Sequence, residues 1–146
     1  MGIEAEVSRK IYADSDAIWE LLADPTSWSS WWTDCEAARS VDGKVLREGS
    51  GLEVVLQPKI MKLTLTPEVG LLSERKLLSL THRSAMIHST VTWQLAEKKE
   101  FVVVTADIVF NGVLPFLIAI SQQSSIVRFS LTNNLKGLKR AAEQRY

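Results

Sequence analysis

Hydrophobic and polar residues alternate along the first stretch of the chain, from Ile3 to Ile11. A period of two places every second side chain on one face, which predicts a half-buried β-strand. Arg9 interrupts the apolar parity, so its side chain either binds a carboxylate or packs its stem and reaches water. Asp14 or Ser15 can cap the helix that follows, because either side chain can accept a hydrogen bond from a free N–H of the first turn.

The next residues predict two short helices in tandem. Apolar positions recur at helical spacing from Ile18 to Leu22, and Asp24-Pro25 ends this first helix. Pro25 suits the first turn of a second helix, over Thr26 to Trp32. The second helix carries three tryptophans, Trp28, Trp31 and Trp32. They either stack on a flat ligand or, for at least two of them, fill the core.

From Cys35 onward the period of two returns, and turn residues recur at short intervals. The predicted strands are Cys35 to Val41, Leu52 to Gln57, Ile60 to Thr66, Lys76 to Arg83, Met86 to Leu95 and Phe101 to Phe110. With the first strand they make seven. Short links of the kind Glu97 to Lys99 suit antiparallel hairpins, so we expect an antiparallel sheet.

The last third of the chain, Val113 to Tyr146, predicts one long amphipathic helix. Its apolar residues recur every three or four positions, and Pro115 falls in the first turn, where its missing N–H costs little. The polar run Ser121 to Ser125 interrupts the apolar stripe and predicts a bend. We expect the helix to lie on the apolar face of the strand that ends at Phe110.

Composition narrows the classes of partner. The 146 residues fit one domain. The 17 basic and 17 acidic residues cancel, which argues against a nucleic acid or an anionic membrane recruited by bulk charge. The longest apolar run, Val113 to Ile120, is too short to cross a bilayer, so no integral membrane association is expected. A monomer and a homodimer both remain open.

Candidate chemistry is sparse. A single cysteine, Cys35, allows no intramolecular disulfide, and with two histidines it makes a metal site improbable. No phosphate loop, nucleophile elbow or other cofactor motif occurs, so no cofactor is expected. The first ten residues lack the apolar stretch of a signal peptide, which together with the lone cysteine predicts a cytoplasmic protein.

Three stretches carry a resemblance to a known family. They are the segment Ile11 to Trp19, the Ala23-Asp24-Pro25 turn with the three tryptophans after it, and Leu135 to Glu143. In their order and spacing they resemble the START/Bet v 1-like (SRPBCC) superfamily, in its polyketide cyclase/dehydrase and lipid-transport branch. The resemblance implies an α+β helix-grip fold, in which a seven-stranded curved antiparallel sheet wraps around a long C-terminal helix. It also implies a cavity between the sheet and that helix.

Such a cavity is lined mainly by apolar side chains, with a few polar ones that orient the ligand. The candidate ligand-binding residues are Trp28, Trp32, Val54, Leu56, Met61, Leu63, Leu80, His82, Trp93, Phe116, Ile120, Gln123, Ser124 and Val127. Gln123 or Ser124 either contacts the ligand or is solvated at the bend of the helix. His82 shares the parity of Leu80 and is either a hydrogen-bonded structural residue or a catalytic acid or base.

These observations favour a protein that binds, and in one version transports, a small apolar or aromatic ligand such as a lipid or a polyketide-like molecule. One alternative is an enzyme of the cyclase, dehydratase or hydrolase type that uses the same cavity without a cofactor, with His82 in the catalytic role. A third is a module for a protein partner whose cavity is filled by side chains.

Overall fold

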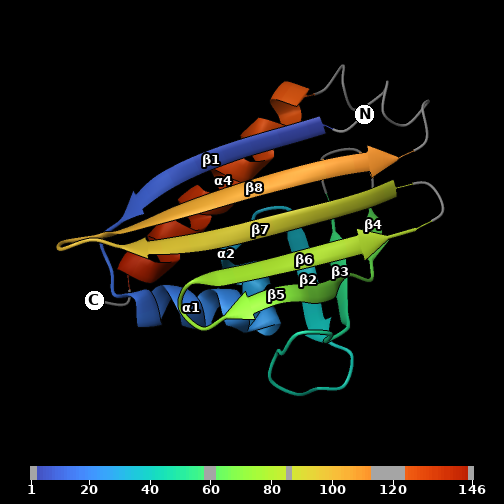
Figure 1. Cartoon of the computed structure of the whole chain (residues 1–146), viewed down its shortest axis with the longest axis horizontal. Helices are drawn as coiled ribbons and strands as arrows, with labels where there is room; N and C mark the ends of the chain where they lie inside the picture. The colour runs from blue at the N-terminus through green and yellow to red at the C-terminus, as the bar shows by residue number, and fades with distance from the viewer. Residues whose placement is uncertain (1–2, 58–61, 85–86, 113–123, 145–146) are drawn as a thin grey trace.

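The fold is taken from a computed structural model, and residues 3–57, 62–84, 87–112 and 124–144 are described. Its main layer is an antiparallel sheet of five strands in the order β1-β8-β7-β6-β5. The bounds are β1 Ile3–Ile11, β5 Glu68–Ser73, β6 Leu77–Arg83, β7 Ile87–Glu97 and β8 Val102–Gly112. Figure 1 shows this sheet in front of the helices.

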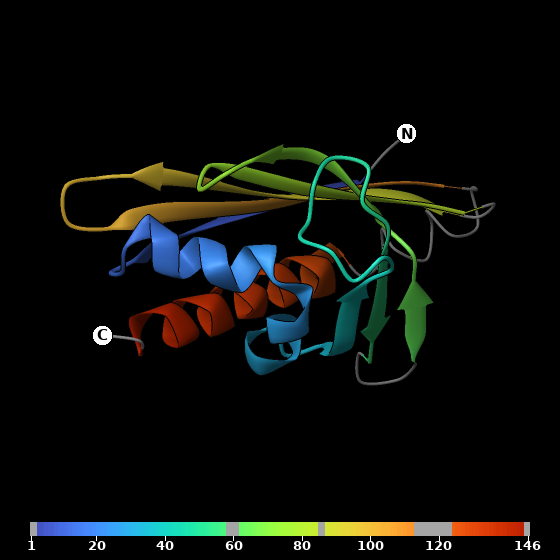
Figure 2. The same ribbon diagram turned by 90° about the horizontal axis from the view of Figure 1, so that it is seen from below.

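A second antiparallel sheet contains three strands in the order β2-β3-β4. These strands are β2 Cys35–Ser40, β3 Leu52–Leu56 and β4 Leu63–Leu65. Figure 2 shows them turned away from the plane of the larger sheet, closing one end of the space in which the helices lie. A bridge between Gly51 and Glu68 connects the two sheets. Beside it, the backbone N–H of Gly49 donates to the carbonyl oxygen of Val69, and the N–H of Val69 donates to the carbonyl oxygen of Ser50.

The α+β helix-grip architecture is confirmed, but the described strands number eight and form two sheets, rather than one sheet of seven. The sequence pattern missed β5. A bulge between Val69 and Leu72 disrupts its pairing with β6, and burial along the strand does not alternate regularly. Gly70 allows the close approach to β6, because an added Cβ would lie 2.8 Å from Ser79 Oγ.

The predicted tandem helices are present as α1 Ser15–Ala23, a 3₁₀ turn Pro25–Ser27, and α2 Trp28–Trp31. Asp14 is the N-cap residue of α1, but its side chain makes no capping hydrogen bond. Ser15 Oγ does not cap the helix either, since it donates to the Glu97 carboxylate at the end of β7. The first turn of α1 is therefore tied to the β7–β8 hairpin instead of being capped locally.

The terminal helix is described as α4, Ser124–Glu143. Pro115 lies outside the described residues. So does the part of the predicted bend from Ser121 to Gln123. The buried face of α4 comprises Leu131, Asn134, Leu135, Leu138 and Ala142. The helix packs mainly on β1 and less on β8, so the expected apolar face of β8 receives it together with its neighbour strand.

A glycine sets the closest approach of α4 to the rest of the fold. A Cβ added at Gly137 would lie 1.8 Å from the backbone oxygen of Trp31, in α2. Because no two such atoms can approach that closely, only glycine fits where the two helices meet. This contact fixes α4 against α2 as well as against the sheet.

Candidate functional site

The inner face of the five-stranded sheet changes from tightly packed to open along its strands. Three rows of residues, each paired across β6, β7 and β8, follow one another: Leu78, Trp93 and Ala106; then Leu80, Val91 and Ile108; then His82, Ser89 and Phe110. The first row is wholly buried, the second contains two half-buried residues, and the third is half-buried throughout. The closed half is the first row together with the next buried pair on its far side, Leu95 and Val104, and the open half is the second and third rows.

Tryptophan rings form the boundary between the two halves. Trp32 meets Trp93 edge to face at 5.9 Å between ring centroids, and Trp28 lies 5.7 Å from Trp32 and 6.2 Å from Trp93. Trp28, Trp31 and Trp93 are fully buried, whereas Trp32 is half-buried. The prediction that at least two of the tryptophans of the second helix fill the core is confirmed by Trp28 and Trp31.

Hydrogen bonds account for the buried position of these indoles. Trp28 Nε1 donates to the carbonyl oxygen of Leu22 at 3.0 Å, and Trp31 Nε1 donates to that of Leu21 at 3.3 Å. The last carbonyls of α1 have no partner within the helix, so these bonds satisfy both sides at once. The tryptophans therefore hold α2 in place against α1.

A buried amide joins α4 to the sheet. Trp93 Nε1 donates to Asn134 Oδ1 at 3.0 Å, and Asn134 is 2 % exposed. From the same helix, Ser130 Oγ donates to Asp34 Oδ2 at 3.0 Å. Asn134 was missed in the sequence, although an asparagine next to Leu135 on the apolar stripe was a visible signal for a buried polar contact.

The smaller sheet and the start of α4 supply the remaining described candidates. Val54 is buried and Leu56 is half-buried in β3, while Val127 is half-buried near the start of α4. Leu63 lies in β4 and pairs with Leu56, and Ser124 is the first residue of α4. The side chains of these two are outside the described part, as are Met61, Phe116, Ile120 and Gln123 altogether.

His82 occupies the third row of the inner face. Its Nδ1 accepts a hydrogen bond from the backbone N–H of Thr66 at 3.4 Å, which links β6 to the segment after β4. An accepting Nδ1 places the proton of the neutral ring on Nε2. The hydrogen-bonded structural role is thus present, on the inward parity that the sequence predicted.

Two inward positions on this face carry further polar side chains, one in each half. Ser89 pairs directly with His82 and was missed in the sequence, although it shares the parity of Val91 and Trp93. Arg9 also has inward parity but lies in the closed half, opposite Val104 of β8. It is half-buried and forms no ion pair with any described carboxylate.

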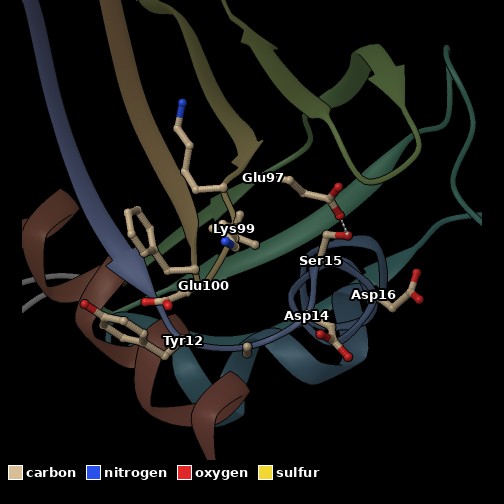
Figure 3. A pocket seen from close by; sticks show the side chains of 11 residues that line it. Tyr12, Asp14, Ser15, Asp16, Glu97, Lys99 and Glu100 are labelled. Atoms are coloured by element: carbon tan, nitrogen blue, oxygen red, sulfur yellow. Dashed lines mark hydrogen bonds between the residues drawn. The ribbon is translucent and has the colours of Figure 1, made fainter.

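A pocket of different character lies at the opposite end of the sheet, with a volume of about 440 Å³. Figure 3 shows charged side chains around it, and the Ser15–Glu97 hydrogen bond crossing its wall. It is lined by Tyr12, Ala13, Asp14, Ser15, Asp16, Glu97, Lys98, Lys99, Glu100, Phe101 and Val102. Four carboxylates and two ammonium groups make this pocket unlike an apolar ligand site.

Three further observations concern the lone cysteine, metal-ligating side chains and membrane spans in the described part of the chain. Burial raises the pKa of the Cys35 thiol to about 11, which suppresses the nucleophilic thiolate. No group of three His, Cys, Asp or Glu side chains is placed to hold a metal ion among the described residues. None of the described helices combines the length and the apolar character that a membrane span requires.

Comparison with known proteins places these features in a family. The profile of the family described as polyketide cyclase/dehydrase and lipid transport matches residues 2–143. Among curated proteins, no significant match was found.

Solved structures show the same fold along nearly the whole chain. An aromatase/cyclase from a Streptomyces species has a TM-score of 0.79 at 16 % identity, and the match covers 99 % of this chain and 96 % of that one. A START superfamily protein of Mycobacterium smegmatis has a TM-score of 0.77 at 12 % identity, covering 99 % of both chains. A major latex-like protein of Panax ginseng has a TM-score of 0.78 at 12 % identity, covering 97 % of both. At these identities the similarity establishes the fold alone.

Proposed function

Because the chain belongs to the polyketide cyclase/dehydrase and lipid-transport family, we propose that it binds a small apolar or aromatic ligand between the sheet and α4. The observation that supports this proposal is the open half of the inner face. Val91 and Ile108 face the helix side of the sheet, as Trp93 and Ala106 do, yet they keep accessible surface. Apolar side chains turned inward but incompletely covered are what a ligand-binding chamber requires.

The binding energy would come from covering this apolar surface. Each Å² removed from water contributes about 25 cal/mol before the costs of ordering the ligand. Trp32 adds the face or edge of an aromatic ring, because its contacts with Trp28 and Trp93 hold it while leaving part of it accessible. A flat or aromatic ligand therefore gains more at this wall than an aliphatic one of equal area.

The test combines two measurements on the purified protein. Native mass spectrometry looks for a co-purified small molecule, and titration with the apolar fluorescent probe N-phenyl-1-naphthylamine measures uptake. Val91→Phe should weaken uptake by at least about tenfold, or ~1.4 kcal/mol, because the larger ring fills the chamber. Thr90→Phe is the matched control: it adds a ring on the outer face of the same strand and should bind as the unmodified protein does.

Two results would count against the proposal. Absence of a co-purified molecule together with no uptake of the probe favours the module with a filled interior. Equal weakening by Val91→Phe and Thr90→Phe places the binding surface somewhere other than the inner face.

A further inference from the structure

A pair of polar side chains stands at the end of the otherwise apolar open half. His82 on β6 and Ser89 on β7 are direct partners in the antiparallel register. Residues opposite each other in such a ladder have Cβ atoms about 5 Å apart on the same face. Both are half-buried, and Phe110 of β8 continues their row. The two side chains therefore lie close enough to contact one ligand group together.

Among the described residues, few hydrogen bonds are made by the side chains of this pair. His82 Nδ1 already accepts from Thr66, so the ring has an N–H left to donate at Nε2. Ser89 Oγ makes no hydrogen bond in the described part of the chain, and it is able to donate as well as accept. Two donors that have no acceptor among the described residues, next to an apolar wall, require a partner once a ligand excludes water.

We propose that His82 and Ser89 hold an uncharged oxygen acceptor, a carbonyl or hydroxyl oxygen, at one end of the ligand. The apolar body of the ligand lies along Val91 and Ile108 toward Trp32. This inference rests on the proposed function and adds a direction and a chemical class to it. The acceptor is uncharged because a buried carboxylate would need a cationic partner, and none of the six residues of the open half is a lysine or an arginine.

The pair contributes selectivity more than affinity. A site that donates hydrogen bonds loses binding to a ligand without the acceptor, because its own donors are then left buried and unsatisfied. Removal of the donors should therefore weaken binding of an oxygen-bearing ligand and leave a hydrocarbon of the same shape nearly unaffected.

The experiment uses two probes of matched shape, 2-acetylnaphthalene and 2-isopropenylnaphthalene. In the second, a CH2 group replaces the carbonyl oxygen of the first. Each probe competes with N-phenyl-1-naphthylamine for the full chain. Ser89→Ala and His82→Leu should each weaken the ketone about fivefold to tenfold and change the hydrocarbon by less than twofold. His82→Gln should restore ketone binding, because an amide can accept from Thr66 and still donate.

Thr90→Val is the matched control, since it removes a hydroxyl from the outer face of β7. Thermal unfolding of every variant establishes that it is folded before binding is compared. Equal weakening of both probes, or no weakening of either, overturns the inference while leaving apolar binding in place. If neither probe binds the unmodified protein and Val91→Phe changes nothing, the proposed function itself is wrong.

Discussion

The closed and open halves of the inner face use similar residues under different packing. In the closed half the buried polar side chains of the described residues have protein partners: the indole N–H of Trp93 donates to Asn134, and that of Trp28 donates to the carbonyl oxygen of Leu22. In the open half Val91 and Ile108 keep accessible surface, and Ser89 has no described partner. The fold therefore places its stabilising contacts at one end of the sheet and leaves the other end with surface and hydrogen-bonding groups available to a ligand.

The largest expected effect concerns the contact that closes the first half. Glycine to alanine normally stabilises a helix interior by about 1 kcal/mol. At Gly137 the new Cβ would collide with the Trp31 carbonyl oxygen, so Gly137→Ala should instead cost about 3 kcal/mol or more. Chemical denaturation measures this loss.

Lys136→Ala, at the exposed neighbouring position, is the control and should change stability by no more than a few tenths of a kcal/mol. An unchanged or higher stability of Gly137→Ala would mean that α4 does not sit against α2 as described.

The second prediction concerns the buried amide. Asn134→Leu leaves the Trp93 indole N–H without its acceptor, so it should cost about 1–3 kcal/mol. A Trp93→Phe variant has no indole N–H that could lose its acceptor. In that background the same substitution should therefore cost much less. Denaturation of both single variants and the double variant gives the coupling; strictly additive costs would contradict the hydrogen bond.

Truncating one valine in each half compares them directly. Val104 is fully buried in the closed half, whereas Val91 is half-buried in the open half. Val104→Ala should lower the free energy of unfolding by about 2 kcal/mol, and Val91→Ala by less than about 1 kcal/mol, because each substitution removes two methyl groups from a differently covered site. Equal costs, measured by denaturation, would show that the two halves are packed alike.

The smallest effect lies on the outer face. Partial burial, with the charges of Glu6 and Glu4, raises the pKa of the Asp107 carboxyl. The native state then binds the proton more tightly than the unfolded chain does, so stability falls as pH rises above the ordinary carboxyl range. Asp107→Asn should stabilise at pH 7 by less than about 1 kcal/mol, given its exposure.

The gain should disappear in acid, where Asp107 is protonated in both states. Thermal unfolding at neutral and acidic pH checks it, and Glu4→Gln should act in the same direction but more weakly. A gain from Asp107→Asn that persists in acid would exclude a charge effect.

Sequence patterns predicted most of the elements in their order because the determinants of each element are local, whereas the helix-grip arrangement was what the family resemblance implied. The alternation in β1 and the tryptophans after Pro25 report directly on which side chains are covered. The strand β5 was not predicted, because its bulge removes the alternation of buried and exposed residues by which a strand is recognised in a sequence.

The candidate site was predictable in its apolar wall and less so in its polar groups. Leu80 and Trp93 follow from parity, but Asn134 and Ser89 matter only through partners 41 and 7 positions away, which pairing across the fold reveals. For Ser89 the sequence shows inward parity without showing that its opposite residue is His82. Long-range register is what single-sequence patterns do not contain.

The bonds between the two sheets also bear on self-association. An uncovered edge strand is a template on which another chain can add a strand. At β5 the backbone groups of Val69 are occupied by Gly49 and Ser50, and at β1 Arg128 and Lys139 of α4 bond the carbonyl oxygens of Glu6 and Lys10. A second copy could extend the sheet at these positions only after breaking those bonds. The contacts that hold the two sheets and α4 together therefore also disfavour edge-to-edge aggregation.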